Sequence, residues 1–136
     1  MSKNQKASKT DYSKYFMFAA IIFIVFCGYR IARKKVLLRE AASLPFYKVE
    51  LEDVSDGTYS GKTYTSFLHL QLDVKIENHK IQEITVIENE GIDGEKARPI
   101  IDKMIEENSI VVPAVKGAEL GSLVYISCVS TALAQK

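Results

Sequence analysis

The sequence predicts an α+β domain, in which two helices pack on an antiparallel sheet, preceded by one N-terminal transmembrane helix. Three observations lead to this prediction. An uncharged and strongly apolar run covers Tyr15–Tyr29. From Val49 onward, polar and apolar residues alternate as they do in half-buried strands. Segments with helical apolar spacing follow the strands, and this order is typical of helices packed on a sheet.

The charge distribution separates the same two parts of the chain. The formal net charge is +1 over 136 residues. Residues 1–48 hold ten basic and two acidic residues, whereas residues 49–136 hold eight basic and fifteen acidic ones. The acidic C-terminal part argues against nucleic-acid binding, because that function needs a basic surface against the phosphates. We expect a polar tail, a transmembrane helix, a stalk and a soluble domain at residues 1–14, 15–32, 33–48 and 49–136.

The apolar run is interpreted as a single membrane span. Tyr15–Tyr29 is short for a span, since about 20 residues usually cross the hydrocarbon core. Ile31 and Ala32 extend the run, and the side chain of Arg30 can reach the interface. Tyrosines flank the run, as they do at membrane interfaces. The run has no polar face, which disfavours a helix that lies in the plane of the interface.

Two alternatives to a span stay open. One is a cleaved signal peptide, although no small-residue cleavage site follows the apolar run promptly. The other is a lipoprotein signal at Cys27, although the bulky Phe26 precedes that cysteine. After the span, the helix is expected to continue as a stalk and to end before Pro45, because proline disfavours helix at the preceding residue.

The basic residues on the two sides of the span bear on its orientation. Four lysines precede the span and five basic residues follow it: Arg30, Arg33, Lys34, Lys35 and Arg39. The positive-inside rule therefore leans toward a cytoplasmic C-terminal domain, by one charge.

Three strand patterns open the soluble domain. Asp56-Gly57 and Gly61 are turn signals around a short strand within residues 54–64. Residues 66–76 alternate strictly, which predicts a strand whose apolar face holds Leu68, Leu70, Leu72, Val74 and Ile76. "ENHK" at 77–80 predicts a hairpin turn in which Asn78 takes a positive φ. Residues 81–90 are the returning strand, which is rich in β-branched residues.

Two helices are expected after the strands. The segment "EKARPIIDKMIEEN" at 95–108 has an apolar helical face, with Pro99 at its first turn or at a kink and Asn108 at its end. Residues 109–112 form a short strand or an extended run. Gly117 is expected to be the N-cap of the last helix, whose apolar face holds Leu120, Leu123, Val124 and Leu133.

This order of features resembles the FMN-binding domain family. The resemblance is carried by "DGTYSG" at 56–61, by the hairpin "VKIENHKIQEITVIE" at 74–88, and by "VVPAVKGAELGS" at 111–122 before a helix that ends in "TALAQ". It covers about residues 53–135. The family includes small membrane-anchored flavoproteins and domains of the sodium-translocating NADH:quinone reductases and of the Rnf complex. The resemblance implies a flavoprotein of membrane electron transport, with its soluble domain outside the cytoplasm.

The loop before the last helix departs from the family pattern. In the family it reads roughly Asp-Ala-Val-Ser-Gly-Ala-Thr, and the threonine can be esterified to the FMN phosphate. Here Glu119 stands in place of that threonine, Pro113 in place of the aspartate and Lys116 in place of the serine. Because a phosphoester needs a hydroxyl, covalent attachment of FMN is not expected. A helix start attracts anions and Lys116 adds a positive charge, but the Glu119 carboxylate repels a phosphate and is interpreted as an internal occupant of its position.

The resemblance implies a noncovalent FMN site, made of strand and loop residues: Gly57, Tyr59, Gly61, Lys116, Gly117, Ala118, Glu119 and Ser122. Each of these residues also has a purely structural interpretation. The glycines suit turns and close helix packing, Lys116 suits solvent, and tyrosines such as Tyr59 and Tyr64 commonly pack on sheets. His69 lies on a polar strand face, and neither it nor His79 has neighbours at metal-ligand spacing, so no metal site is expected.

Two functions stay open. The first is a membrane-anchored protein that holds FMN noncovalently or weakly and takes part in electron transfer, with the cofactor supplying the chemistry. The second is a flavin-free structural or interaction subunit of a membrane redox complex, which uses the former flavin face for a partner. The expected partners are the membrane and other subunits of such a complex. An independent enzyme is not expected, because the sequence has no nucleophile–base set and no pair of catalytic carboxylates.

Overall fold

The computed structural model describes residues 6–135, with side chains from Tyr12 onward. Residues 1–5 of the predicted polar tail lie outside the described residues. Contacts between residues divide the chain into two units, 1–36 and 37–136. The second unit begins upstream of Val49, where the soluble domain was expected to start, because the end of the long N-terminal helix packs with the domain.

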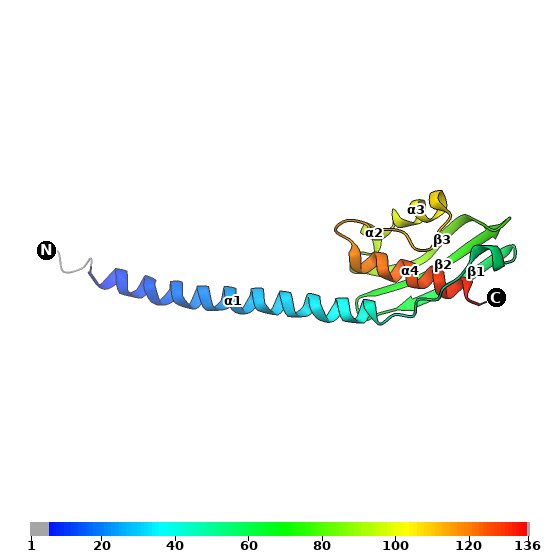
Figure 1. The fold of residues 1–136 in the computed structure, drawn as a ribbon. Coiled ribbons are helices and arrows are strands. Elements are labelled where there is room, and N and C mark those ends of the chain that lie inside the picture. The colour runs from blue at the N-terminus through cyan, green and yellow to red at the C-terminus, as the bar shows by residue number, and fades with distance from the viewer. Residues whose placement is uncertain (1–5, 136) are drawn as a thin grey trace. The chain divides into compact units, whose positions relative to one another are not determined.

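The first unit is part of a single helix, α1 (Lys6–Ala42), drawn from blue to cyan in Figure 1. Within the described residues it is the one helix that is long and apolar enough to cross a membrane, and its most apolar window has no buried residue. The helix continues past the apolar run, as predicted, and ends three residues before Pro45. Ala41, near its end, is fully buried in the core of the second unit.

The second unit is an antiparallel sheet in the order β1 (Gly57–Tyr64), β2 (Leu68–Glu77) and β3 (Lys80–Gly91). A 3-10 turn, η1 (Leu51–Asp53), precedes it. The β2–β3 hairpin turns at Asn78 and His79, both with positive φ, which confirms the prediction for Asn78. The predicted apolar face of β2 is also confirmed, since all five of its residues are buried: Leu68, Leu70, Leu72, Val74 and Ile76.

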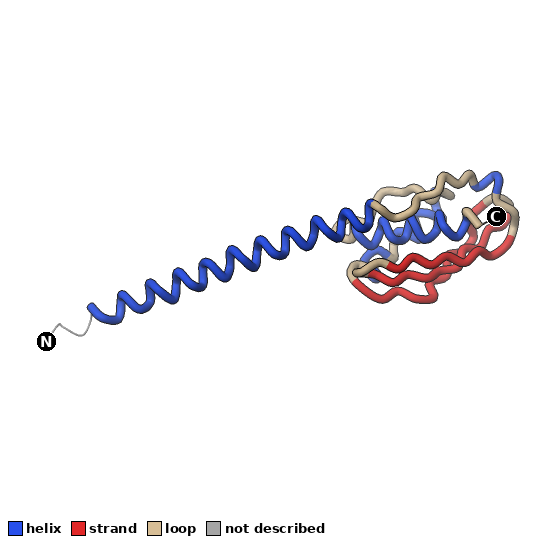
Figure 2. The backbone as a smooth tube through the Cα atoms, turned by 90° about the horizontal axis from the view of Figure 1, so that it is seen from below, coloured by secondary structure: helices blue, strands red, loops and turns tan. Residues whose placement is uncertain are grey.

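Three helices cover the apolar face of this sheet: α2 (Gly94–Ala97), α3 (Ile100–Glu107) and α4 (Glu119–Leu133) (Figures 1 and 2). The α+β class is therefore as predicted. The single helix expected at 95–108 is divided, because Pro99 becomes the N-cap of α3. Asn108 ends α3 in a left-handed conformation, as predicted. Residues 109–112 belong to no strand, and the backbone bends at Ile110.

Helix α4 is the central element of the second unit. Twelve of its fifteen residues are buried, which is more than the single apolar face expected from the sequence. The sheet covers one side of the helix. The segment after α1 covers another: the Ser127 hydroxyl donates to the Pro45 carbonyl at 2.8 Å, and the Tyr47 N–H donates to Ser130 Oγ at 3.4 Å. The sequence predicted Gly117 as the N-cap of α4, and this prediction is wrong, because the N-cap is Ala118.

Candidate functional site

In the loop before α4, several backbone N–H groups donate hydrogen bonds to acceptors within the loop and the first turn of the helix. Gly117, with φ of +84°, donates its N–H to Glu119 Oε1 at 3.1 Å. The buried Ser122 hydroxyl accepts from the Val115 N–H at 2.9 Å and donates to the Ala118 carbonyl at 2.8 Å. The Ala118 N–H in turn donates to the Val115 carbonyl at 2.9 Å. A side-chain oxygen or a carbonyl of the chain itself therefore accepts from the N–H of Val115, Gly117 and Ala118.

The carboxylate of Glu119 matters most in this loop. It lies at the start of α4, where the helix dipole favours a negative charge, and it accepts one of the N–H groups that an anion would use. The interpretation of Glu119 as an internal occupant of a phosphate position stays a prediction. Lys116 beside it is exposed, and an added Cβ at Gly117 would meet nothing within 4 Å.

Of the strand residues of the predicted site, Gly61 lies directly against α4. An added Cβ at Gly61 would lie 2.5 Å from the Cys128 carbonyl oxygen and 2.9 Å from the Ala132 Cβ, so only glycine allows α4 to approach β1 this closely. The half-buried Tyr59 packs against the core, and its hydroxyl donates to the Ser55 carbonyl at 2.7 Å. Gly57 opens β1 with φ of +155°.

The structure does not bring the two halves of the predicted site together. Gly121, in the first turn of α4, packs against the Asp93 carbonyl after β3, whereas Gly61 packs against the last turns of α4. Gly57 and Tyr59 precede Gly61 on β1 and lie beyond it, on the side away from the start of α4. A helix of fifteen residues is about 22 Å long, so these strand residues and the loop around Gly117 lie near opposite ends of α4 (Figure 1).

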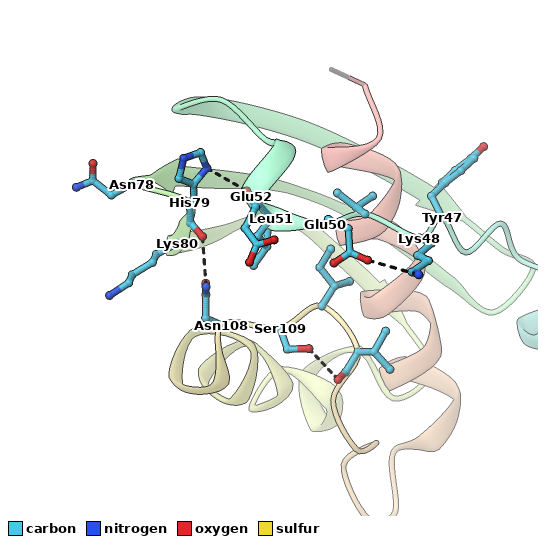
Figure 3. Close-up of a pocket in the computed structure, with 13 residues that line it drawn as sticks. Tyr47, Lys48, Glu50, Leu51, Glu52, Asn78, His79, Lys80, Asn108 and Ser109 are labelled. Carbon is cyan, nitrogen blue, oxygen red and sulfur yellow. Dashed lines mark hydrogen bonds and ion pairs between the residues drawn. The ribbon is translucent and has the colours of Figure 1, made fainter.

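A groove that the sequence did not indicate lies elsewhere in the second unit (Figure 3). Its volume is about 470 Å³, and three segments line it: 47–52 after α1, 78–80 of the hairpin turn, and 108–111 after α3. These segments are far apart in the sequence, and no motif joins them, so composition and spacing could not reveal the groove.

Hydrogen bonds of Asn108, after α3, and of His79, in the hairpin turn, join the walls of the groove. Asn108 accepts from the Ile81 N–H at 2.9 Å through Oδ1 and donates to the His79 carbonyl at 3.3 Å through Nδ2. The His79 ring lies 3.3 Å from the Leu51 carbonyl oxygen through Nδ1 (Figure 3). The left-handed cap that ends α3 thus also fixes the hairpin turn. Val111 on one wall is 79% exposed, although it is a large apolar residue.

A second cluster occupies the solvent face of the sheet. The Tyr64 hydroxyl donates to Glu88 Oε2 at 2.8 Å, and His69 Nδ1 lies 4.0 Å from Glu88 Oε1. The rings of Tyr64 and His69 are 4.9 Å apart. The hydrogen bond to Glu88 raises the pKa of Tyr64 above its usual range. The cluster is open to water and lines none of the cavities described for the molecule, so it offers no enclosed place for a substrate.

The residues present do not fit an FMN phosphate well. A phosphate at the start of α4 would need the Gly117 N–H, which Glu119 already accepts, and Ser122 uses its hydroxyl as both donor and acceptor. The carboxylate would also repel it. Among the described residues, no group of three or more His, Cys, Asp or Glu side chains is placed to hold a metal ion.

Comparison of the chain with models of known protein families, with curated proteins and with solved structures gives no match.

Proposed function

We propose that the chain is a single-pass membrane protein whose C-terminal domain acts as a flavin-free structural or interaction module. The observation that carries this proposal is the hydrogen bond from the Gly117 N–H to Glu119 Oε1. It puts a carboxylate of the chain at the one position where the resemblance calls for a phosphate. Without a cofactor at that loop, the domain has no evident redox group, and its remaining feature of functional interest is a surface for a partner.

The long helix α1 supports the membrane part of the proposal. Its apolar residues between Tyr15 and Tyr29 are exposed, and a soluble protein has no reason to expose so many. In the hydrocarbon core of a membrane, the free-energy cost of exposing these apolar side chains to water disappears. The orientation stays a prediction from the resemblance, with the domain outside the cytoplasm. Protease added to intact cells should then remove the domain and leave a short N-terminal fragment.

The groove supports the interaction part of the proposal. Its walls include residues 47–52 and 108–111, which belong to no strand, and the side chain of Val111 is presented to solvent. A concave surface with an apolar side chain on its wall offers a protein partner a place to dock. Other subunits of a membrane complex are the class of partner that the resemblance implies.

Noncovalent FMN is the alternative, and absorbance separates the two functions. We would purify the full chain in detergent, add FMN, remove the excess and record the flavin bands before and after acid precipitation. The proposal expects no retained colour from the wild type. Colour released into the supernatant would favour noncovalent FMN, and colour in the pellet would contradict the argument about Glu119. Glu119→Gln is the informative variant: if the carboxylate is what excludes phosphate, this variant should bind FMN better than the wild type does.

Cross-linking in intact membranes tests the interaction itself. A photoreactive residue at Val111 should give a defined protein adduct, identified by mass spectrometry. The matched control is Ile87, which is also an exposed apolar residue (54%) but lies on the sheet strand β3, away from the groove. Equal adducts from both positions, or none from Val111, would count against the groove as a partner surface.

A further inference from the structure

Four basic side chains follow directly on the apolar run of α1 and form a cluster, here called the basic cluster: Arg30, Arg33, Lys34 and Lys35. All four are exposed. The sequence has no Asp or Glu from Tyr12 through Arg39. Within the described residues, the ion pairs join other side chains, so none of them neutralises the cluster. Among the described side chains, no ion pair therefore balances this charge.

The depth of the cluster matches one layer of lipid headgroups. From Arg30 to Lys35 the helix rises about 7.5 Å, and the headgroup layer on each side of a bilayer is about 5–7 Å thick. The Arg30 guanidinium lies 5.9 Å from the centre of the Phe26 ring, so its side chain turns back toward the apolar run. When that run lies in hydrocarbon, Arg30 is at its boundary and the other three charges are within the headgroups.

The angular spread of the cluster suits several small anions. At 100° per residue, Arg30, Arg33 and Lys34 fall within an arc of about 100°, and Lys35 lies on the other side of the helix. One rigid partner would contact one side, whereas lipids surround a helix completely. Arginine also offers a fork of donors that matches phosphate oxygens.

We propose that the basic cluster binds the headgroups of anionic phospholipids, so that the protein gathers such lipids around the C-terminal end of its span. This proposal rests on the proposed membrane anchoring of α1. Each basic residue near an anionic surface strengthens binding about fivefold in favourable cases, and the effect weakens with salt.

The test compares lipid preference in reconstituted bilayers. The full chain is placed in vesicles of phosphatidylcholine with spin-labelled phosphatidylglycerol or spin-labelled phosphatidylcholine, and the fraction of each label immobilised at the protein is measured. The wild type should hold phosphatidylglycerol several-fold more strongly than phosphatidylcholine, and salt should reduce this ratio. R30Q/R33Q/K34Q/K35Q should bring the ratio close to one.

The control variant is K62Q/K75Q/K96Q/K103Q, which removes four exposed lysines of the second unit. It should keep the wild-type ratio, because the loss of net charge is the same and only the position differs. An equal loss in both variants, or no preference in the wild type, would overturn the proposal. Alkaline extraction is measured in parallel. A wild type that is extracted from the vesicles defeats both the anchoring and the lipid binding, whereas an inserted protein without preference defeats the lipid binding alone.

Discussion

Helices α1 and α4 are both strongly apolar, yet the structure places them in opposite environments. The apolar run of α1 is exposed on all sides, whereas nearly all of α4 is buried. Neither helix has the one-sided pattern of a surface helix. Length separates them: α1 has 37 residues and α4 has 15, and about 20 apolar residues are needed to cross a bilayer. An apolar helix of α4's length fits in a protein core, whereas one of α1's length is long enough to lie in the hydrocarbon of a bilayer.

A lysine placed in each helix should give the largest contrast. Val129→Lys puts a charge at a fully buried position of α4, and we expect it to cost more than about 4 kcal/mol of unfolding free energy, because no partner compensates the buried charge. Ile22→Lys puts the same charge in the middle of the exposed run and should leave the unfolding of the domain unchanged.

Two measurements check this pair. Urea unfolding of the second unit should be affected by Val129→Lys alone. Membrane insertion should be affected by Ile22→Lys alone, with a cost of about 3 kcal/mol for a lysine at the centre of a span. A loss of domain stability in Ile22→Lys would mean that the apolar run is covered by protein and would contradict the comparison.

Gly61, which lies on β1 against α4, and Gly28 of α1 give the next contrast. Gly61→Ala inserts a Cβ that would lie 2.5 Å from the Cys128 carbonyl oxygen, so α4 must shift away from β1. We expect a loss of about 1–3 kcal/mol, as is usual for overpacked cores. Gly28→Ala in α1 meets nothing within 4 Å and is the control. Thermal unfolding of both variants measures the difference, and an unchanged Tm in Gly61→Ala would contradict the close approach.

The two cysteines extend the comparison to pH. Burial raises the pKa of Cys128 from its ordinary value of 9.0 to about 11. The folded state therefore holds the thiol proton more tightly than the unfolded state does. The stability due to this proton is complete below about pH 9 and is lost as the pH rises toward about 11. The loss for two pKa units is about 2–3 kcal/mol.

Variants of each cysteine separate this effect from general alkaline unfolding. Urea unfolding between pH 8 and pH 11, under reducing conditions, should show a shallower decline for Cys128→Ala than for the wild type. Cys27→Ala should follow the wild type. Parallel declines in all three proteins would show that Cys128 titrates as in the unfolded chain.

The sequence predicted the elements better than their environment. Leu68 to Ile76 alternate strictly, and local alternation alone is enough to place their strand and its buried face. The turn at Asn78 and the cap at Asn108 are likewise local signals. The burial of α4 is not local, because Pro45 and Tyr47 cover it from about 80 residues upstream. Gly61 was predicted either to approach a flavin or to serve a turn, and the structure shows that it lets α4 approach β1, a contact that a single glycine in a strand does not reveal.

The candidate site shows the same limit. The sequence predicted a carboxylate at the start of α4 from the chemistry of Glu119 alone, whereas its hydrogen bond with the Gly117 N–H, two residues away, is known only from the structure. The groove depends on three distant segments, and nothing in the sequence of any one of them indicates that the other two lie beside it.

The hydrogen bonds that fasten the segment after α1 to α4 give the smallest effect on stability. Ser127→Ala removes the donor to the Pro45 carbonyl, and since Pro45 is exposed, water can replace that donor. We expect a loss of about 1 kcal/mol. Ser43→Ala is the control, because its hydroxyl donates to the Glu40 carbonyl in an exposed hydrogen bond. The more sensitive measurement is proteolysis after the exposed Phe46 and Tyr47, which should become faster in Ser127→Ala than in the wild type under conditions in which both proteins stay globally folded. Unchanged cleavage would mean that apolar packing alone holds the segment after α1 against α4. The burial of α4 would then depend on its side chains and not on hydrogen bonds to that segment.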